Sequence, residues 1–482
     1  MQCEVSWVLQ QLSDAHVLVS SKESRSISGL SWDSRTITTN DIYLALPGEC
    51  VDGHDYVSAA LEAGASLIIV MHKLEQSVYD AASSCGATIV CVSDTSQALT
   101  ELAAAWRKEL TAQVIVLTGS CGKTTTKNLM HEVLSCCGSV IATEGNQNNE
   151  LGVPRTLLRA QRDTKYVVVE IGMRGKGQLT SMCSWVKPSI GVITNVGESH
   201  IELLGSRENI ACAKSEVFEA LNGAHATAYI NADDDFAVFV RDHARLDERG
   251  VTVVCYDGSG KDPSSYDARM RPSVYASDLE MDETGHVRFM LHIPGDSAEC
   301  SLALRGRHSV IDACAAAAVG AQQGLSARTI AAALSRVDAM SGRQRVIVND
   351  EGVTIIDDAY NANPESMMAS LDLLSAMKVP GRRFAMLGDM GELGSFAHKG
   401  HAMIGAQVAA KHIDRLLCFG PLSQTISQTA ARSGMNKDAI SDVASIDEAL
   451  DRLKHELHKG DAVLIKASHS MGLERIVEGL VK

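Results

Sequence analysis

A short glycine-containing loop has the residue types needed to bind phosphate. It reads TGSCGKTT, follows the apolar run VIVL and opens a helical pattern. Its glycines let backbone N–H groups approach phosphate oxygens, and a helix N-terminus adds partial positive charge. Lys123 would neutralise the β- and γ-phosphates of a nucleotide, and the hydroxyl of Thr124 or Thr125 would reach Mg²⁺. The residues of this loop expected to bind phosphate are Thr118, Gly119, Ser120, Cys121, Gly122, Lys123, Thr124 and Thr125.

The loop departs from the full phosphate-loop motif at its first position. That motif begins with glycine at the place occupied here by Leu117, and the shorter pattern is less specific. The alternative interpretation is a glycine turn followed by a solvated lysine. We favour phosphate binding because a buried-strand pattern precedes the loop and a helix pattern follows it.

Phosphoryl transfer also needs a metal ion held by hard ligands. Glu170 ends the run YVVVE, and His200 follows the run GVITNVGES. Both would lie at the carboxyl ends of parallel strands, where open α/β sheets bind ligands. Each alone is typical of a solvated carboxylate or a hydrogen-bonded loop histidine, but together behind the loop they favour metal ligation. Lys214, in the helical stretch RENIACAKSEVFEAL, is solvated by default; a buried lysine there would be open to chemical modification or to a lowered pKa.

Three segments must position these residues, and the first two are clear in the pattern. Residues 1–110 contain the strand-like runs DIYLAL, ASLIIV and ATIVCV and end in the helical LTELAAAWRKEL. Residues 111–338 contain the apolar runs VIVLTG, YVVVEIG, GVITNV and VTVVCYD, each followed by helical patterning, as in a parallel sheet buried on both faces. The alternation in VRFMLHIPGDSAECSLAL then predicts antiparallel strands around a Pro-Gly-Asp turn, and HSVIDACAAAAVGAQQGL predicts a helix closed by Gly324.

Residues 339–482 form the last segment. Its apolar runs TIIDDAY, RFAMLGDM, RLLCFG and AVLIKAS alternate with helical stretches, which predicts a second doubly wound sheet. No G-x-G-x-x-G follows its first strand, so a dinucleotide site is not favoured. The predicted fold class is therefore α/β with three domains: a small α/β domain, a central phosphate-loop domain with a mostly parallel sheet, and a C-terminal Rossmann-like domain.

The composition limits the partners and the compartment. Lys and Arg number 44 against 59 Asp and Glu, a net charge of −15, which disfavours nucleic acid but not a nucleotide. The 13 cysteines include no C-x-x-C pair, so free thiols in a reducing compartment are expected. The N-terminus lacks a signal-peptide pattern, and no apolar stretch reaches the roughly 18–20 residues of a membrane span. We expect a cytoplasmic protein without membrane insertion.

The motifs, in their order along nearly the whole chain, resemble the Mur ligase family of cell-wall synthesis. The first segment carries DSRTITTNDIYLALPGECVDGHDYVSAALEAGA, similar to the family's uridine-nucleotide domain. The middle carries TGSCGKTTTK, TEGNQNNELGVP, EIGMRGKGQL, TNVGESHIELLGSRENIACAKSE and NADDD. The last carries GRQR, IDDAYNANPESM, LGDMGELG and LIKASHSM. DDAYNANP and LGDMGELG are the most specific, and they resemble the family member that adds D-alanyl-D-alanine.

The resemblance implies an activity. An ATP-dependent acid–amino-acid ligase would join D-alanyl-D-alanine to UDP-N-acetylmuramoyl-tripeptide through an acyl phosphate, using ATP and two Mg²⁺ ions in peptidoglycan precursor synthesis. The family is mostly monomeric, so a monomer is expected. The third residue of the tripeptide, diaminopimelate or lysine, and the general base stay open. The alternatives are a related ligase that adds another amino acid and an ATP-binding regulatory protein.

The resemblance also implies roles for individual residues. Lys214 falls on a lysine that is carbamylated in related ligases, where the carbamate supplies oxygen ligands to a metal; whether this chain needs it stays open. The implied catalytic residues are Lys123, Lys214, Arg343 and Asp358. The further ATP-binding residues are Asn231, Asp312 and Arg343, and the metal ligands are Thr124, Glu170, His200 and Lys214. The implied substrate-binding residues are Ser34, Arg35, Asn148, Asn149, Asn361, Asn363, Lys466 and Ser468.

Some positions depart from the family pattern. Ser309 and Asp312 replace two asparagines ahead of the Ala-rich helix, which leaves the adenine contact open. His469 replaces an arginine in the C-terminal KGSR pattern and would be a partial substitute for it as a carboxylate-binding group near neutral pH. Cys121 is predicted to have a lowered thiol pKa and to be sensitive to oxidation, because it lies at a helix N-terminus.

Two further expectations concern movement and surface. Three domains with short linkers predict closure over the substrates, with hinges near 109–113 and 338–342. His398 and His401 are expected on a surface helix face rather than in the chemistry.

Overall fold

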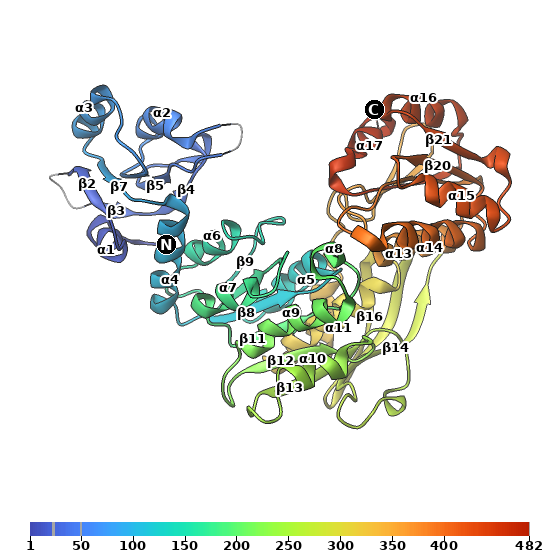
Figure 1. The fold of residues 1–482 in the computed structure, drawn as a ribbon. Helices are drawn as coiled ribbons and strands as arrows, with labels where there is room; N and C mark the ends of the chain where they lie inside the picture. Colours follow the sequence, from blue (N-terminus) through green and yellow to red (C-terminus); the bar gives the residue numbers. More distant parts are fainter. Residues whose placement is uncertain (22–24, 49–50, 482) are drawn as a thin grey trace. The chain divides into compact units, whose positions relative to one another are not determined.

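The computed structural model describes residues 1–21, 25–48 and 51–481 (Figure 1). The chain separates into two compact units by its internal contacts. Unit 1 comprises 1–117, 138–172 and 180–190, and unit 2 comprises 118–137, 173–179 and 191–482. Three large sheets run through the chain, one in each of the predicted segments. No helix among the described residues is long and apolar enough to cross a membrane.

The first sheet belongs to unit 1 and has the order β2-β7-β6-β5-β4, parallel except for β2. Its strands are β2 (His16–Val19), β4 (Gly29–Ser31), β5 (Asp41–Leu44), β6 (Leu67–Val70) and β7 (Thr88–Cys91), so the three predicted strands are confirmed. The helices around it are α1 (Val5–Gln11), α2 (Val57–Glu62), α3 (Gln76–Cys85) and α4 (Thr95–Glu109). Strands β1 (Cys3–Glu4) and β3 (Ser26–Ile27) form a separate antiparallel pair.

Helix α4 is fastened to later parts of unit 1. The Trp106 indole N–H donates to the Ala160 carbonyl at 2.9 Å, and the Arg107 guanidinium donates to the Val186 carbonyl at 2.8 Å. Ala160 directly follows α6 (Gly152–Arg159). The residues just before the first predicted hinge, 109–113, are therefore anchored by one buried and one half-buried hydrogen bond.

The central sheet has the order β16-β15-β14-β13-β12-β11-β8-β10-β9. Its strands are β8 (Gln113–Thr118), β9 (Val140–Ala142), β10 (Tyr166–Glu170), β11 (Ile190–Ile193), β12 (Thr227–Asn231), β13 (Thr252–Asp257), β14 (Val274–Met281), β15 (His286–Ile293) and β16 (Asp296–Arg305). Strands β14 to β16 are antiparallel, as the alternating pattern predicted. The prediction of a helix after VTVVCYD is wrong: β13 leads through a short 3-10 turn (Pro263–Ser265) into β14, because Pro263 and Pro272 interrupt the helical pattern.

The helices of the middle segment complete that domain. They are α5 (Lys123–Ser135), α6, α7 (Gln178–Val186), α8 (Ile201–Leu204), α9 (Arg207–Glu219), α10 (Ala237–His243), α11 (His308–Gln322) and α12 (Ala327–Leu334). The Ala-rich helix is thus confirmed as α11, and Gly324, with φ of 84°, follows its end. Lys214 lies on α9 and Asp312 in the first half of α11, both in unit 2 with the phosphate loop.

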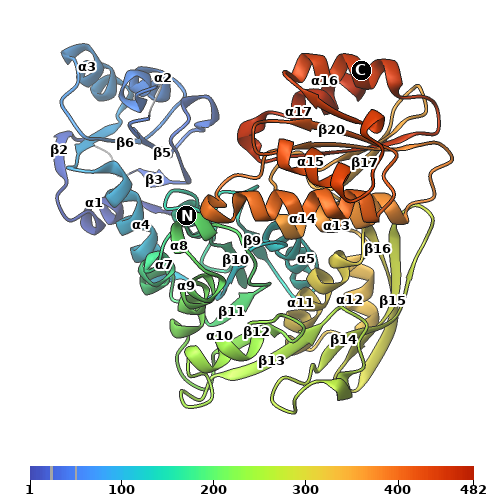
Figure 2. The same ribbon diagram turned by 45° about the vertical axis from the view of Figure 1, so that its right-hand side comes forward.

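The third sheet is doubly wound, as predicted, and has the order β17-β18-β22-β19-β20-β21. Its strands are β17 (Arg345–Val348), β18 (Thr354–Asp357), β19 (Arg383–Gly388), β20 (Arg415–Phe419), β21 (Ile440–Val443) and β22 (Ala462–Lys466), parallel except for β17. Helices α13 (Pro364–Ala376), α14 (Ala397–Ala410) and α15 (Gln424–Arg432) cover one face, and α16 (Ile446–Glu456) and α17 (Glu474–Val481) cover the other (Figure 2).

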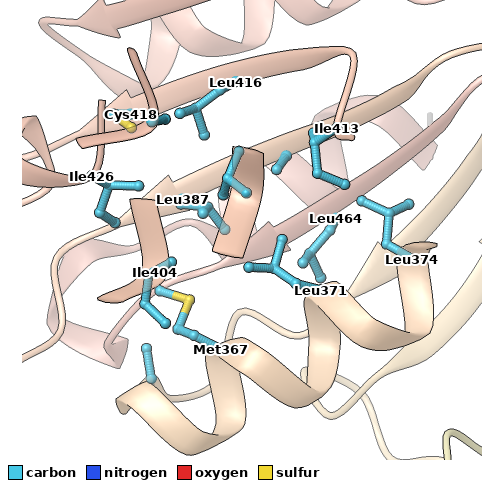
Figure 3. Packing of buried hydrophobic residues seen from close by; sticks show 14 of the residues in the cluster. Met367, Leu371, Leu374, Leu387, Ile404, Ile413, Leu416, Cys418, Ile426 and Leu464 are labelled. Atoms are coloured by element: carbon cyan, nitrogen blue, oxygen red, sulfur yellow. The ribbon is translucent and has the colours of Figure 1, made fainter. Parts of the chain in front are cut away.

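Large apolar side chains fix α13 and α14 on their face of this sheet. Met367 and Leu371 of α13 and Ile404 of α14 point toward Leu387 and Leu464 of the strands (Figure 3). All five are fully buried. Because α13 is held in this way, its N-terminal residues have a defined position within unit 2.

The chain enters the third sheet through a constrained turn at the second predicted hinge. Gly342 and Gln344 have positive φ values of 74° and 54°, a region that costs a residue other than glycine about 1–3 kcal/mol. The Gly342 N–H donates to the Asp357 carboxylate at 2.8 Å, and the Gln344 N–H to Asp358 at 3.2 Å. The two acids at the end of β18 therefore stabilise the turn.

Candidate nucleotide and metal site

The predicted phosphate loop is a strand–loop–helix unit. It joins β8 to α5, with Gly122 in the left-handed region (φ of 78°) as the residue before the helix. Lys123 is the first helical residue, and its Nζ donates to the Gly119 carbonyl at 2.7 Å. Thr118 and Thr124 are buried and Thr125 is half-buried. The loop thus has the predicted order of strand, glycine turn and helix, and the Lys123 ammonium would have to leave a carbonyl of its own loop to meet a phosphate.

Thr194 and Asn195, directly after β11, hold the loop from one side. The Asn195 Oδ1 accepts from the N–H groups of Ser120 and Cys121, both at 2.9 Å. The Thr194 hydroxyl donates to the Cys121 carbonyl at 2.6 Å, and a Cβ at Gly119 would overlap this hydroxyl. Our sequence analysis missed both residues. The available signal was their place at the end of an apolar run, inside the motif TNVGESH.

Replacing Asn195 with alanine should raise the KM for ATP roughly tenfold, because two loop N–H groups lose their acceptor and the loop loses its shape. The measurement is ATP-dependent phosphate release with both other substrates saturating. Replacing Asn222, an exposed asparagine, with alanine is the matched control. An unchanged KM for ATP in the Asn195 variant would contradict the inference that Asn195 holds the loop in shape.

Asp312 touches the same loop from α11. Its Oδ1 accepts from the Thr126 hydroxyl of α5 at 2.9 Å, and a Cβ at Gly122 would overlap that oxygen. The side chain is buried, with 7% of the residue exposed. Burial raises the pKa of Asp312 to about 7, against the opposing effects of the Thr126 hydrogen bond and the Arg343 charge. The predicted ATP-binding residue is therefore a carboxyl group enclosed beside the phosphate loop.

Lys214 is buried on α9, with 1% of the residue exposed. Burial lowers the pKa of its ammonium to about 7, and the nearby charge of Lys123 adds to this effect. A neutral amine reacts with carbon dioxide to form a carbamate, whereas an ammonium does not. The surroundings of Lys214 thus favour the modification that the resemblance implies.

The two other predicted metal ligands lie in different units. His200 precedes α8 in unit 2, and its Nδ1 lies 2.6 Å from the Glu392 carboxylate, so its predicted role as a metal ligand would fall to Nε2. The nearby His200 imidazole lowers the pKa of Glu392. Glu170 ends β10 in unit 1, where its Oε1 accepts from the Asn148 side-chain amide at 2.8 Å.

The prediction of a reactive Cys121 thiol is wrong. The group is enclosed between the loop and the N-terminus of α13: it donates to Asn363 Oδ1 at 3.3 Å and lies 3.6 Å from Glu365 Oε2. Burial, followed by the Glu365 charge, raises the pKa of Cys121 to about 12. These two effects outweigh the helix N-terminus, so the thiol stays protonated at neutral pH.

Asn363 connects the loop to the third sheet. It caps α13, where its side-chain oxygen accepts from the Ser366 N–H at 2.8 Å. Its side-chain amide donates to Ser199 at 2.6 Å. The side chain of Asn363, a predicted substrate-binding residue, thus directly contacts the phosphate loop in unit 2, through Cys121. Neighbouring Asn361 is exposed.

Arg343 lies in a stack of side chains. Its guanidinium lies 4.4 Å from the centre of the Tyr360 ring, and the His469 ring also stacks on Tyr360, with 5.6 Å between the ring centres. A cation over an aromatic face gains about 0.5–2 kcal/mol. Tyr360 therefore orients the arginine that is predicted to meet the γ-phosphate, and links it to the histidine that departs from the family pattern.

Lys466 and Asp358 form a buried ion pair. Their Nζ and Oδ2 atoms lie 2.7 Å apart, and their side chains are 2% and 9% exposed. Lys466 also donates to the Asn361 carbonyl at 2.7 Å, and the Ser370 hydroxyl donates to Asp358 at 2.5 Å. The predicted substrate-binding lysine thus contacts the DDAYNAN turn in this structure, and its interactions order that turn.

Replacing Lys466 with methionine should destabilise the protein by about 3–5 kcal/mol, because the Asp358 carboxylate would stay buried without its partner. The measurement is the midpoint of thermal unfolding at pH 7. The double variant with Asp358→Asn should recover part of the loss, since it removes the unpaired charge. A larger loss in the double variant would contradict a pairwise charge effect.

The remaining predicted residues have local partners. Arg35 pairs with Asp33 at 2.7 Å and is exposed, next to Ser34 in a short 3-10 turn. The Asn149 side-chain oxygen accepts from the Gly152 N–H, at the start of α6, at 3.0 Å, and Asn231 donates to the Thr194 carbonyl at 3.4 Å. Ser468 accepts from the Gly391 N–H at 2.8 Å.

The expectation for the two histidines of α14 holds for one of them. His398 is exposed, as expected. His401 is fully buried, which corrects its expected surface position: its Nε2 accepts from the Met390 N–H at 3.0 Å, and its Nδ1 lies 2.7 Å from the Ala397 carbonyl. Both ring nitrogens are occupied, so the role of His401 is structural.

The strand–loop–helix unit, the residues after β11 that hold its loop and the separate doubly wound sheet define a nucleotide-dependent enzyme of the phosphate-loop class. Family models describe the parts in turn: the Mur ligase family catalytic domain matches residues 26–107, the Mur ligase middle domain 117–320, and the Mur ligase glutamate ligase domain 342–469. The chain belongs to the Mur ligase family.

Named relatives cover almost the whole chain. The UDP-N-acetylmuramoyl-tripeptide–D-alanyl-D-alanine ligase of Bacillus subtilis is 34% identical, over 95% of this chain and 94% of its own length. The crystal structure of MurF from Acinetobacter baumannii is similar with a TM-score of 0.82 at 27% identity, covering 100% of this chain and 99% of that one. MurF ligase from Thermotoga maritima, solved in complex with ADP, has a TM-score of 0.75 at 26% identity, with 94% and 96% covered.

Proposed function

We propose that this chain is an ATP-dependent ligase that joins D-alanyl-D-alanine to UDP-N-acetylmuramoyl-tripeptide and yields the UDP-linked pentapeptide, ADP and phosphate. The observation that carries the proposal is the likeness to enzymes of that name, at 34% identity over 95% of the chain for the Bacillus subtilis relative. The ADP complex of the Thermotoga maritima enzyme supports the use of ATP. The product is a precursor of peptidoglycan.

The chemistry requires an activated acid. A carboxylate oxygen is a poor leaving group, so the tripeptide carboxylate first takes the γ-phosphoryl group of ATP and becomes an acyl phosphate. The dipeptide amine then attacks the acyl carbon, and phosphate leaves from the tetrahedral intermediate. Side chains contribute by positioning and by charge. In unit 2, Lys123 would stabilise charge on the β- and γ-phosphates, and Arg343, oriented by Tyr360, charge on the transferring group.

Acyl phosphates hydrolyse, so the enzyme must exclude water from the reacting group. We propose that closure about the turn at 338–342 does this. The hydrogen bonds from the Gly342 and Gln344 N–H groups to Asp357 and Asp358 support the proposal. They give the turn one ordered conformation, and closure would form or break these bonds. Asp358, which is predicted to lie near the nucleotide, would contribute by accepting the hydrogen bond from this turn and by pairing with Lys466.

We propose that Mg²⁺ binds next to the phosphate loop and supplies neutralisation of phosphate charge. The donors fit on one condition. Thr124 offers a hydroxyl and His200 its Nε2, but the Lys214 amine is a poor ligand for a hard cation until a carbamate gives it oxygen donors. The burial and lowered pKa of Lys214 support that modification. Glu170 stays a predicted ligand from unit 1.

The remaining proposals concern partners and place. The uridine-nucleotide part of the substrate would bind the first segment through Ser34 and Arg35, and its muramoyl part would bind Asn148 and Asn149. We propose domain boundaries at 1–110, 111–338 and 339–482, a monomer, and a cytoplasmic site of action where the precursors and ATP meet. The boundaries are supported by one large sheet within each range.

The test is phosphate release from ATP by the purified protein. With the UDP-linked tripeptide present, D-alanyl-D-alanine should start the reaction and single amino acids should not. Comparing a UDP-linked tripeptide that ends in diaminopimelate with one that ends in lysine identifies which third residue the enzyme accepts. Release driven by a single amino acid would indicate a different family activity. Release without any acceptor would favour the regulatory alternative, in which ATP hydrolysis acts as a switch.

A further inference from the structure

The carboxyl group of Asp312 is placed where a bound triphosphate would bring negative charge. It lies against the Gly122 turn of the phosphate loop and accepts from Thr126, one turn into α5. Asp312 and Thr126 are 7% and 0% exposed, so bulk water does not screen the carboxyl group. An ionised carboxylate here would repel any phosphate held by the loop.

The groups that face Asp312 do not neutralise it. Arg343 is the charged side chain that acts on it, but that guanidinium lies over the Tyr360 ring and forms no ion pair with the carboxyl group in the part of the chain that the structure describes. From β13 the phenol of Tyr256 faces the same region, and burial raises the pKa of that phenol well above 10, so it stays neutral. The hydrogen bond from Thr126 is the direct stabilisation of the ionised form.

We propose that ATP binding to this protein is coupled to the uptake of one proton, which the Asp312 carboxyl group receives from solvent. The inference rests on the proposed use of ATP and deepens it. Free protein near neutral pH holds Asp312 partly ionised, and the entry of the triphosphate favours its neutral form. The neutral acid keeps Oδ1 as the acceptor for Thr126 and gains an O–H donor at its other oxygen.

The sign of the pH dependence follows from the two forms. Burial gives Asp312 a pKa of about 7 in the free protein, and the added phosphate charge raises it further in the complex. Below pH 7 the carboxyl group is neutral in the free protein and in the ATP complex, so it does not weaken ATP binding. Between the two pKa values each rise of one pH unit weakens ATP binding by up to about tenfold. ATP affinity should therefore fall by about tenfold from pH 6 to pH 8.

The experiment is isothermal titration calorimetry of MgATP binding to the full chain at pH 6, 7 and 8, without tripeptide or dipeptide. At pH 8, buffers of different ionisation enthalpy give the number of protons taken up. The matched variant is Asp312→Asn, which keeps an acceptor for Thr126 but cannot ionise. Because the nucleotide's own titration is common to both proteins, the difference between them isolates Asp312.

We expect the wild-type protein to take up close to one proton more than Asp312→Asn at pH 8 and to lose about tenfold in affinity across the range, while the variant stays nearly level. A second variant, Thr126→Val, removes the hydrogen bond that favours the ionised form. Its loss of affinity should begin at higher pH than that of the wild type, which tests the proposal if Asp312→Asn folds poorly.

Each other outcome overturns a different statement. Equal proton uptake and equal pH dependence in the wild type and Asp312→Asn would overturn the inference and leave ATP binding intact. Wild-type affinity that rises with pH would also overturn it, because an ionised Asp312 would then be holding a cation for the nucleotide. Absence of MgATP binding to the wild type at every pH would overturn the proposed function itself.

Discussion

Replacing Lys123 with alanine will lower ATP-dependent phosphate release by at least about 100-fold and weaken ATP binding. Lys123 is the first residue of α5, and its Nζ now lies 2.7 Å from the Gly119 carbonyl, inside the loop that the phosphates would enter. Removing a single pre-positioned donor from a site of developing charge costs about 10²–10³-fold in turnover. The effect on binding follows because the same ammonium would neutralise phosphate in the ground state.

The control separates the loss of a charge from the loss of the fold. Lys73→Ala removes one exposed lysine from the first segment and should leave turnover unchanged. Lys123→Ala should keep the far-ultraviolet circular dichroism and the thermal midpoint of the wild type, since its ammonium donates to the Gly119 and Ser120 carbonyls, which belong to its own loop. Turnover retained in Lys123→Ala would mean that the loop is not the phosphate site.

Replacing Lys214 with alanine will reduce turnover by about 100-fold, and short carboxylic acids such as formate or acetate will restore part of it. The side chain is 1% exposed and its pKa is lowered to about 7 by burial. Addition of carbon dioxide to the neutral amine forms a carbamate and releases a proton. A small carboxylate that enters the cavity left by the variant would supply oxygen donors in place of that carbamate.

The pH dependence has a definite sign. Carbamate formation needs the neutral amine, which predominates above a pKa of about 7. Wild-type activity in buffer depleted of bicarbonate should therefore be low near pH 6. Added bicarbonate should restore more of the activity at pH 8 than at pH 6. Lys214→Met, which no carboxylate can rescue for lack of space, is the control. Full activity of Lys214→Ala without added acid would rule out a ligand role for this residue.

Much of the fold could be predicted from local patterns. Continuous apolar runs marked β5, β6, β10 and β11, because strands covered on both faces have little room for polar residues. Alternation marked β15 and β16. The prediction of a helix after β13 was wrong because the apolar spacing there continues across Pro263 and Pro272, and proline interrupts a helix interior.

The site could be predicted in part. The loop from Thr118 to Thr125 is visible in the sequence because its glycines, lysine and threonines are contiguous. The pair of Lys466 with Asp358 is not, since the two residues are 108 positions apart and meet only when β22 and β18 align. The same reason hid the enclosure of Cys121 by Asn363 and Glu365, so a local rule about helix N-termini gave the wrong pKa direction.

The tryptophans are unevenly shared between the two compact units. All four, Trp7, Trp32, Trp106 and Trp185, belong to unit 1, whereas the phosphate loop belongs to unit 2. Intrinsic tryptophan emission will therefore follow the melting of unit 1 alone. If ATP shifts the melting curves measured by emission and by circular dichroism equally, the two units unfold together. If ATP shifts only the circular dichroism curve, the units unfold separately. Ligand screens that follow tryptophan emission would then overlook compounds that bind the nucleotide site.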